Sequence, residues 1–356
     1  MKNLARIERI DAVEKHDNAD SLDIVTVKGW KVISKRGEFT PGRLCVYVEI
    51  DSLLPEKECF AFMERVKYRV KTIRLRGRIS QGIVFPLDIL DEDWVDLPEG
   101  FEKKIGEDVT EILEVKKFEK PVPLGCQSIG SFPTHLCAKT DETRVQNIHT
   151  DKLLDFFRNS GGIDVRIKHD GSSLTVAKDP EGEVYLCSRN NRLDATKEGS
   201  AFSSVFEKYD LGSIPESHVV QAELIGPKIQ GNKEGLAAAD IRVFNVFKDR
   251  ETQMDANEMN DFCNARGLPV AERIYTGEVE DFLEILWNTL ELRFSDFAFT
   301  SMTELLLNFA DTLTYRNGAR AEGMVVRPIN PFYDDYLCKN FSFKVVSNEF
   351  LLKNKE

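Results

Sequence analysis

The amino-acid sequence predicts an α+β protein built from two domains, a small β-barrel followed by a larger domain of strands and helices. The 356 residues exceed one small module and can bury two separate cores. Short strand-like runs fill residues 1 to about 90, whereas strand and helix patterns alternate after residue 150. Pro121 and Pro123 interrupt the chain between these regions, so we expect domains at 1–125 and 126–356.

The first domain is predicted to be a closed barrel of the OB type. Its strand-like runs are 5–10, 22–27, 30–35, 44–50, 69–75 and 81–85. Turn signals such as Lys28-Gly29, Arg36-Gly37 and Arg76-Gly77 separate these runs. Five or six short strands with little helix are typical of a small barrel that closes on itself.

The composition is that of a soluble globular protein. Hydrophobic residues make up 42% and charged residues 30%, which excludes collagen-like, disordered and membrane classes. The net charge of −12 argues against blanket nucleic-acid binding but allows a local basic groove. The sequence shows neither a targeting signal nor an apolar stretch of membrane length, so we expect a cytoplasmic protein with no membrane partner.

The cysteines and histidines predict no disulfide frame and no structural metal cage. The chain has 7 Cys, widely spaced and without a CxxC pair, and 5 scattered His. An odd number of separated cysteines indicates reduced, buried thiols in an intracellular protein.

The second domain alternates strand and helix patterns. Strands are expected at 163–168, 172–178, 183–188, 218–225, 241–247, 322–327 and 341–346. Helices are expected near 151–159, 257–266, 278–290 and 302–313, where apolar residues recur three and four apart. The mixture indicates an α+β domain.

The segment Lys168-His169-Asp170-Gly171 carries the most informative chemistry. Alternation over 163–168 places Lys168 at the end of a strand, and the three residues after it are expected to form a tight turn. A lysine amine becomes a nucleophile when burial or neighbouring positive charge lowers its pKa. An exposed lysine before a β-turn is the alternative interpretation.

Five further segments follow in order. The first contributes an arginine that follows a strand and could bind a phosphate. The next three contribute a carboxylate within a strand, an aromatic residue within a strand, and a carboxylate at the start of a strand. The fifth contributes a lysine in the last strand. These residues are Arg189, Glu223, Phe244, Glu322 and Lys344. Each could be an ordinary salt bridge or core side chain, but six such segments in one order indicate a functional site.

In this order the segments resemble the motifs of covalent nucleotidyltransferases, which comprise ATP-dependent polynucleotide ligases and mRNA capping enzymes. The similarity covers nearly the whole chain and is greatest to ATP-dependent RNA ligases with an N-terminal OB domain. The run Thr143-Arg144-Val145-Gln146-Asn147 is a further RNA-ligase-like feature. The resemblance implies that the second domain is an ATP-grasp-like adenylyltransferase domain with antiparallel sheets and helices.

The resemblance also implies an ATP-dependent polyribonucleotide ligase that seals 3′-OH and 5′-phosphate RNA ends, as at nicks in RNA repair. Lys168 would attack the α-phosphorus of ATP, release pyrophosphate and retain AMP. The AMP would then pass to the RNA 5′-phosphate, and a 3′-OH would displace it. Mg²⁺ or Mn²⁺ would be the metal cofactor.

Roles for individual residues follow from the same resemblance. Lys168 and Lys344 would be catalytic, Lys344 by binding the α-phosphate. Phe244 would stack on adenine, with Phe247 as the alternative. Metal would be held, partly through water, by Asp170, Glu223 and Glu322. The nucleotide-binding set is Arg144, Gln146, Asn147, Asp170, Gly171, Arg189, Glu223, Phe244, Glu322 and Lys344.

The last motif departs from the family pattern. Many ligases carry a second lysine two positions after the first, and this chain has Val346 there. Lys344 alone could suffice, or Lys339 or Lys353 could assist.

Other functions also remain open: a GTP-dependent capping guanylyltransferase, a DNA ligase, or a non-catalytic OB-fold RNA-binding protein. The sequence shows no oligomerisation motif, so we expect a monomer.

A basic strip in the first domain suits RNA. Residues 64–78 include Arg65, Lys67, Arg69, Lys71, Arg74, Arg76 and Arg78 against the single acid Glu64. Basic residues mixed with aromatic ones on an OB surface favour single-stranded or nicked RNA. We expect RNA contacts from Arg69, Lys71, Arg74 and Arg76, with a solvated strand face as the alternative.

Overall fold

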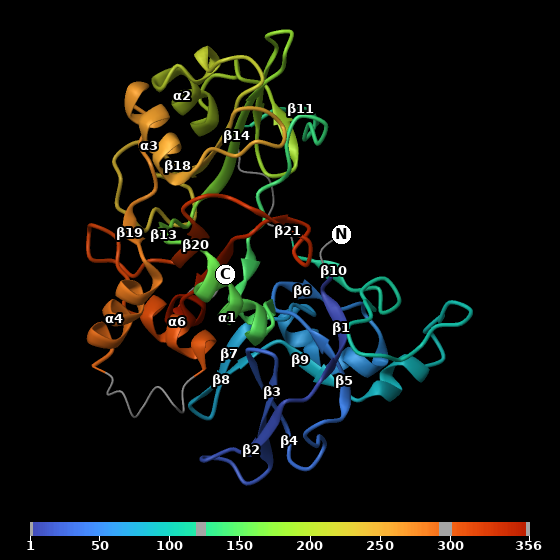
Figure 1. Ribbon diagram of the computed structural model, residues 1–356. Helices are drawn as coiled ribbons and strands as arrows, with labels where there is room; N and C mark the ends of the chain where they lie inside the picture. The colour runs from blue at the N-terminus through green and yellow to red at the C-terminus, as the bar shows by residue number, and fades with distance from the viewer. Residues whose placement is uncertain (1–2, 119–125, 292–300, 354–356) are drawn as a thin grey trace. The chain divides into compact units, whose positions relative to one another are not determined.

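The computed structural model describes residues 3–118, 126–291 and 301–353 (Figure 1). The chain forms two compact units. The first unit comprises Met1–Pro121 together with two short pieces, Gln146–His149 and Leu352–Glu356. The second unit comprises Val122–Val145 and Thr150–Leu351.

The first unit is made of short antiparallel strands. Its sheets have the orders β1-β5-β9, β2-β3-β4, β7-β8 and β10-β6. The strands are β1 (Ala5–Arg9), β2 (Ala12–Lys15), β3 (Leu22–Val27), β4 (Trp30–Lys35), β5 (Leu44–Val48), β6 (Ser52–Leu53), β7 (Thr72–Leu75), β8 (Arg78–Gln81), β9 (Ile83–Phe85) and β10 (Lys116–Lys117). Two 3₁₀ helices accompany them, η1 (Glu58–Val66) and η2 (Leu87–Asp91). This arrangement agrees with the OB-type prediction.

The expected strand at 69–75 is shorter than predicted. Only β7 forms there, and the chain turns back at Arg76 and Gly77 into β8, which the sequence patterns did not indicate. The φ angles of these two residues are 48° and 93°, as in the two-residue type I′ turn of a hairpin. A tight hairpin therefore carries the C-terminal end of the basic strip, with Arg74, Arg76 and Arg78.

The second unit is built on two sheets. One has six strands in the order β11-β16-β15-β14-β17-β18, and the other has five in the order β12-β23-β20-β13-β19. Every pair is antiparallel except β12 with β23. The strands are β11 (Ser128–Ser131), β12 (Thr143–Arg144), β13 (Ile163–Lys168), β14 (Ser172–Lys178), β15 (Val184–Cys187), β16 (Asn191–Leu193), β17 (Val219–Ile225), β18 (Asp240–Phe247), β19 (Arg273–Gly277), β20 (Gly323–Pro328) and β23 (Phe343–Val346). A small ladder of β21 (Tyr333–Asp334) and β22 (Lys339–Asn340) completes the set.

Four helices after residue 149 lie near their predicted positions, and two more were not predicted. The predicted ones are α1 (Thr150–Asn159), α3 (Ala256–Ala265), α4 (Val279–Thr289) and α6 (Met302–Ala310), whereas α2 (Ala201–Lys208) and the short α7 (Asn348–Lys353) were not predicted. Single 3₁₀ turns occur at η3 (Val145–Asn147) and η4 (Leu211–Ser213). Across the three described ranges, no helix has the length and apolar character required to cross a membrane.

Residues 169–171, where the sequence predicts a tight turn, do not join β13 and β14 into a hairpin. The two strands belong to different sheets, so residues 169–171 carry the chain from the five-stranded sheet to the six-stranded one. A Cβ on Gly171 would lie 2.2 Å from the Leu224 carbonyl oxygen, so only glycine permits this close crossing. Lys168 therefore stands where the two sheets meet.

Candidate active site

Lys168 ends β13, and its ammonium lies against a carboxylate beside the neighbouring strand. Lys168 pairs in register with Gly323, the first residue of β20, so Glu322 comes directly before that strand. The Lys168 Nζ donates to Glu322 Oε2 at 2.6 Å, and the two side chains are only 22% and 16% exposed. A Cβ at position 323 would lie 2.0 Å from the Val345 oxygen. Glycine thus allows β20 and β23 to approach behind the pair.

A buried tyrosine joins three backbone groups around Lys168. The Tyr315 hydroxyl accepts hydrogen bonds from the Asp170 and Glu322 N–H groups, each at 3.1 Å. It donates to the Lys168 carbonyl at 3.4 Å. Burial raises the pKa of Tyr315, so the hydroxyl stays protonated and available as a donor. The ring of His169 stacks on the tyrosine at a centroid distance of 5.7 Å.

Three carboxylates influence the charge on Lys168. Burial raises the pKa of Glu223 to about 7; neighbouring carboxylates reinforce this shift and Lys168 opposes it. The Gly171 N–H donates to Glu223 Oε1 at 3.1 Å. Burial alone lowers the pKa of Lys168, but Glu322, Glu223 and Asp170 together raise it above the usual 10.5. The protein's own charges therefore hold the amine protonated, the opposite of what a nucleophile requires.

A second lysine, which the sequence patterns did not single out, lies beside the first. Lys233 Nζ donates to Asp170 Oδ2 at 2.6 Å, with the lysine side chain 21% exposed. The same ammonium lies 4.1 Å from the ring centroid of Phe350 on α7. The centre thus contains two ammonium groups and three carboxylates.

Arg189 and Lys344 share one carboxylate, that of Asp141. Arg189 NH2 lies 3.1 Å from Asp141 Oδ2, and Lys344 Nζ lies 3.7 Å from Asp141 Oδ1. Arg144 of β12 is buried and pairs in register with Lys344 of β23. Lys339 Nζ donates to the Asp141 carbonyl at 2.8 Å. The structure therefore brings these predicted cations together around an acid that sequence reasoning missed.

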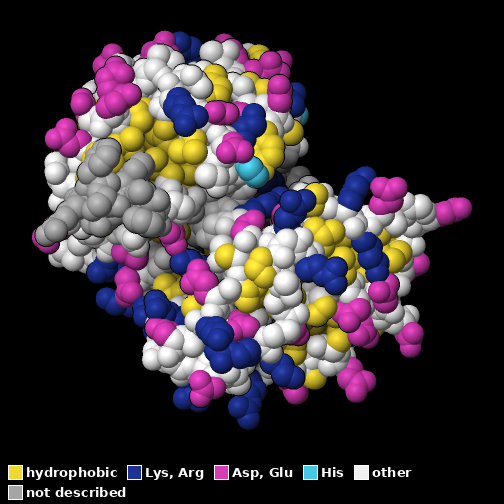
Figure 2. Space-filling model, turned by 60° about the horizontal axis from the view of Figure 1, so that its bottom comes forward, with side chains coloured by type: hydrophobic (Ala, Val, Ile, Leu, Met, Phe, Trp, Pro, Cys, Tyr) yellow, Lys and Arg dark blue, Asp and Glu magenta, His cyan; other side chains and the backbone are white. Residues whose placement is uncertain are grey.

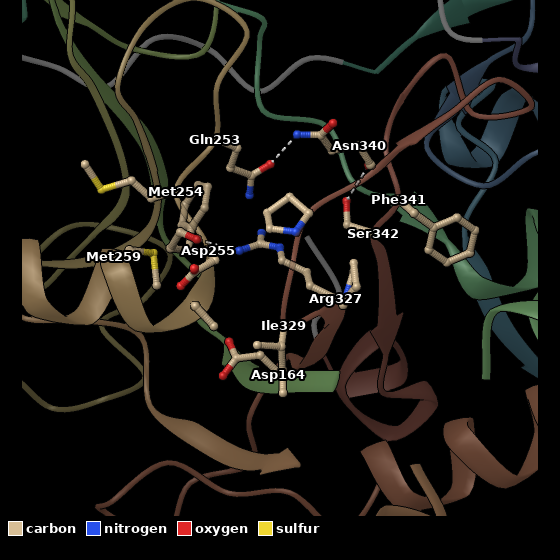
Figure 3. A pocket seen from close by; sticks show the side chains of 14 residues that line it. Asp164, Gln253, Met254, Asp255, Met259, Arg327, Ile329, Asn340, Phe341 and Ser342 are labelled. Atoms are coloured by element: carbon tan, nitrogen blue, oxygen red, sulfur yellow. Dashed lines mark hydrogen bonds between the residues drawn. The ribbon is translucent and has the colours of Figure 1, made fainter. Parts of the chain in front are cut away.

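Phe244 lines a pocket, whereas Phe247 packs into an apolar cluster. The pocket, shown in Figure 3, includes Phe244, Met254, Arg327 and Asp164, which lies on the same β13 face as Lys168. The guanidinium of Arg327 lies 5.8 Å from the Phe244 ring centroid and donates to the Phe244 carbonyl. Phe247 packs instead on the cluster of Phe132, Cys137, Ala177, Cys187 and Val219.

Gln146 and Asn147 are grouped with the first unit. Asn147 accepts a hydrogen bond from Trp30 Nε1 at 2.7 Å and donates to Glu49 Oε1 at 3.1 Å. Gln146 is 1% exposed, and its carbonyl accepts from the Gly29 N–H at 3.3 Å. Their predicted role in nucleotide binding stays a prediction.

The predicted RNA-binding residues differ in exposure. Arg69 is 13% exposed and pairs with Asp51 at 3.3 Å, and Lys71 is half-buried. Arg74 and Arg76 are exposed at the β7–β8 hairpin. Only these last two project a substantial positive surface.

Apolar side chains accompany the exposed arginines of the hairpin. Ile73 is 45% exposed and Leu75 is 37% exposed. On the face shown in Figure 2, Lys and Arg side chains are interspersed with Asp and Glu rather than gathered into one basic field. Positive charge on this face is therefore confined to small groups of side chains.

The carboxylates fit a metal ion that keeps much of its water. Asp170, Glu223 and Glu322 supply the oxygen ligands that Mg²⁺ and Mn²⁺ prefer. Within the described ranges, however, no three His, Cys, Asp or Glu side chains are grouped to cage an ion. Asp170 and Glu322 are instead paired with lysines. The donor chemistry fits, and the arrangement favours binding through water and substrate oxygens.

The residues missed by sequence reasoning lie mainly outside regular strands. Lys233 is in the loop between β17 and β18, Tyr315 is between α6 and β20, and Asp141 precedes β12. Periodicity says nothing about such loops. The only sequence signal was position, because Asp141 comes two residues before the run that begins at Thr143.

Two family models match the sequence. An OB-fold domain matches residues 4–87, and RNA ligase matches residues 164–346. A search of curated protein sequences found no relative.

Solved structures of a Naegleria gruberi RNA ligase resemble this chain over its full length. The structure with PPi has a TM-score of 0.79 and 27% identity, covering 100% of this chain and 99% of that one. A mutant with ATP and Mn has a TM-score of 0.79 and 26% identity, with both chains covered at 100%. A mutant with AMP and Mn has a TM-score of 0.78 and 26% identity, with both covered at 99%.

The RNA ligase match spans the segments from Lys168 to Lys344, and the OB-fold match covers most of the barrel that precedes them. They favour an RNA ligase over a capping enzyme, a DNA ligase or a non-catalytic binding protein. The chain belongs to the RNA ligase family, and it is an RNA ligase with an N-terminal OB-fold domain.

Proposed function

We propose that this ligase uses ATP to join RNA ends bearing a 3′-OH and a 5′-phosphate, held together at a nick, through AMP bound covalently to Lys168. The similar Naegleria ligase has been solved with ATP and Mn and with AMP and Mn, which supports the choice of nucleotide and metal. Within this chain the observation that carries the proposal is the half-buried Lys168 amine at the end of β13, bonded to Glu322 at 2.6 Å.

The reaction would comprise three transfers. The Lys168 Nζ forms a bond to the α-phosphorus of ATP as the bond to pyrophosphate breaks. A 5′-phosphate oxygen of RNA then takes the AMP from Lys168, which recovers its amine. Finally a 3′-OH attacks the activated 5′-phosphate, and AMP leaves. Each transfer builds negative charge on phosphate oxygens, so positioned cations supply most of the catalysis.

Lys168 must lose a proton before it attacks. Glu322 Oε2, at 2.6 Å, is the nearest acceptor that the structure places beside the amine. Asp170, Glu223 and Glu322 would hold Mg²⁺ or Mn²⁺, partly through water, and the bound ion would lower the lysine pKa and neutralise phosphate charge. The buried carboxylates keep the amine oriented until then.

The remaining predicted residues would hold the nucleotide. Arg189 and Lys344 would exchange Asp141 for phosphate oxygens, and Arg144 would support Lys344 from the adjacent strand. The pocket position of Phe244 favours it over Phe247 as the adenine-stacking residue. Gly171 would keep the link between β13 and β14 close to β17, because a side chain there would meet the Leu224 carbonyl oxygen.

The first domain, which we place at 1–125, would bind RNA. Arg74 and Arg76 would contact the backbone from the hairpin, assisted by Arg69 and Lys71. Nucleotide binding by Gln146 and Asn147 stays a prediction. The second domain would span 126–356. We also propose that the enzyme acts as a monomer in the cytoplasm, and sedimentation and fractionation of cells would test these two points.

The central chemistry can be tested with α-labelled ATP and Mg²⁺ or Mn²⁺. Wild-type protein is expected to acquire label stable to denaturation, while Lys168→Ala acquires none. Lys178→Ala, a change at the far end of β14, is the matched control and should label normally. An unlabelled wild type, or label that persists on Lys168→Ala, would refute the proposal.

Substrate choice needs a separate comparison. Labelling with ATP but not GTP, and sealing of nicked RNA strands but not DNA strands, are the expected results. Equal labelling by GTP would contradict the ATP assignment, and equal sealing of DNA nicks would contradict RNA specificity.

A further inference from the structure

Lys233 stands out because it brings a second ammonium into the carboxylate centre from outside every predicted motif. Its Nζ is 2.6 Å from Asp170 Oδ2, two residues along the chain from Lys168. Its ammonium also lies 4.1 Å from the Phe350 ring centroid. The aromatic ring shields one side of the charge and leaves the other directed at the carboxylate.

The loop that carries Lys233 is held in place on both sides of this residue. Asn232 bonds through its side chain to both the N–H and the carbonyl of Leu236, at 3.0 and 2.9 Å. Asn317 Nδ2 donates to the Lys233 carbonyl at 2.8 Å. Because these hydrogen bonds already order the loop, less conformational entropy is lost when the lysine contacts a ligand.

The next residue ties the loop to the nucleophile's own segment. Glu234 Oε1 lies 2.7 Å from His169 Nδ1, and His169 is the residue after Lys168. Glu234 Oε2 also lies 3.9 Å from Arg242 of β18. Lys233 and Lys168 are therefore fixed relative to each other through a short chain of contacts.

The last strand leaves a role for this ammonium. Lys344 is followed on the same face of β23 by Val346, which is 2% exposed and pairs in register with Gly323. β23 therefore presents one lysine to the site. Phe350, which packs on Lys233, follows Val346 by four residues. Lys233 thus supplies positive charge close to the end of β23, where the strand itself has the apolar Val346.

We propose that Lys233 is a catalytic residue that leaves Asp170 to contact a non-bridging oxygen of the ATP α-phosphate during transfer to Lys168. This inference rests on the proposed function. As the Lys168 nitrogen bonds to the α-phosphorus and the bond to pyrophosphate breaks, Lys233 donates a hydrogen bond to an oxygen that gains negative charge. The pair with Asp170 holds the ammonium in place before the nucleotide arrives.

The first measurement is the rate of AMP transfer to the protein. Lys233→Met should lower that rate by about 10²-fold, as loss of one donor to a transition-state oxygen does, and Lys233→Arg should retain part of it. Lys228→Met, at an exposed lysine of the same loop, is the matched control. An unchanged rate in Lys233→Met would overturn the inference while leaving Lys168 chemistry intact, whereas no transfer in wild type would overturn the proposed function itself.

A binding series separates phosphate contact from a purely structural role. Adenosine, AMP and ATP are titrated against Lys168→Met, which blocks transfer, with and without Lys233→Met. AMP and ATP should bind about tenfold more weakly in the double variant, and adenosine should bind equally well. An equal loss of affinity for adenosine would overturn the phosphate contact and show that Lys233 acts only by positioning Asp170. Loss confined to ATP would move the contact to the leaving pyrophosphate and overturn the α-phosphate assignment.

Discussion

In the protein without ATP, Asp141 pairs with Arg189 and Lys344, the two cations that we propose bind phosphate. Because it pairs with both Arg189 and Lys344, ATP must displace it before these side chains can bind phosphate oxygens. Asp141→Asn keeps the shape but removes the competing charge, so we expect ATP to bind about three- to tenfold more tightly, equivalent to about 1 kcal/mol.

Calorimetric titration of ATP into Lys168→Met, with and without Asp141→Asn, measures this effect. Asp335→Asn, at an exposed carboxylate of the same unit, controls for the change in net charge. Weaker ATP binding in Asp141→Asn would mean that Asp141 helps to hold the nucleotide.

The Tyr315 hydroxyl is a second residue whose removal has a defined cost. Tyr315→Phe leaves the partly buried N–H groups of Asp170 and Glu322 without their acceptor. We expect the free energy of unfolding to fall by about 1–3 kcal/mol and AMP transfer to slow, because both groups frame Lys168. Urea denaturation measures the first and labelled ATP the second. Tyr336→Phe, at a tyrosine 49% exposed, should do neither, and a Tyr315→Phe protein of wild-type stability would contradict the bonding scheme.

Which residues could be anticipated from sequence depended on where they lie. The place of Lys168 at the end of a strand was predictable because strict alternation ends there and glycine follows at 171. Lys233 and Tyr315 were not, since their roles arise from contacts 63 and 145 residues away in sequence, both with Asp170. Loop side chains acquire such contacts only through tertiary structure.

At the scale of elements, the segment 138–142 connects strands of both sheets in the second unit. Thr140 Oγ1 lies 3.0 Å from Ser173 Oγ on β14, and the Ala138 carbonyl accepts from Gln221 on β17 at 3.0 Å. Glu142 pairs with Arg327 of β20 at 2.7 Å. This strap fixes the place from which Asp141 reaches the cations.

The Glu142 carboxyl makes the strap sensitive to acid. Burial raises its pKa, but Arg327, Lys339 and Ser342 outweigh burial and hold it at about 2, below the usual 4.5. A folded-state pKa below the unfolded value adds stability above pH 4.5, and that stability is lost as pH falls towards 2. Removing the charge should therefore cost most at neutral pH.

The corresponding test compares wild type with Glu142→Gln. The gap between their free energies of unfolding should be widest at neutral pH and narrow as the pH falls below about 4.5. Glu304→Gln, in the first turn of α6, provides the control for one lost carboxylate. A gap that stays constant with pH would show that the ion pairs do not stabilise the fold.

Most elements were predictable because their side-chain period is regular. β3, β4, β13 and β14 have the predicted bounds, as their alternation is interrupted by clear turn residues. α2 was missed although Ser200 caps it and Phe202, Val205 and Phe206 share its buried side, since eight residues give few repeats. The crossing after β13 was not predicted because sequence does not reveal that two successive strands enter different sheets.

At the scale of the whole molecule, a net charge of −12 coexists with a predicted RNA substrate. Local positive charge resolves this, because phosphate attraction decays over about 8–10 Å at physiological salt. The exposed arginines of the β7–β8 hairpin would then bind RNA although the chain as a whole is acidic.

The double variant Arg74→Ala/Arg76→Ala tests this division of labour. RNA should bind more weakly, with a salt dependence reduced by about two phosphate contacts, and AMP transfer from ATP should proceed at the wild-type rate. Lys103→Ala/Lys104→Ala removes equal charge from another part of the first unit and should preserve RNA binding. Unchanged RNA affinity in the hairpin variant would refute its role.

The most direct test of the whole mechanism is a chase from isolated enzyme–AMP. The protein is adenylated with labelled ATP, freed of ATP, mapped by peptide mass spectrometry and mixed with nicked RNA bearing a 5′-phosphate. We predict AMP on the peptide containing Lys168, followed by its loss from the protein and the sealing of one nick per adenylated chain. AMP on another residue, or protein-bound AMP that RNA does not remove, would contradict this mechanism.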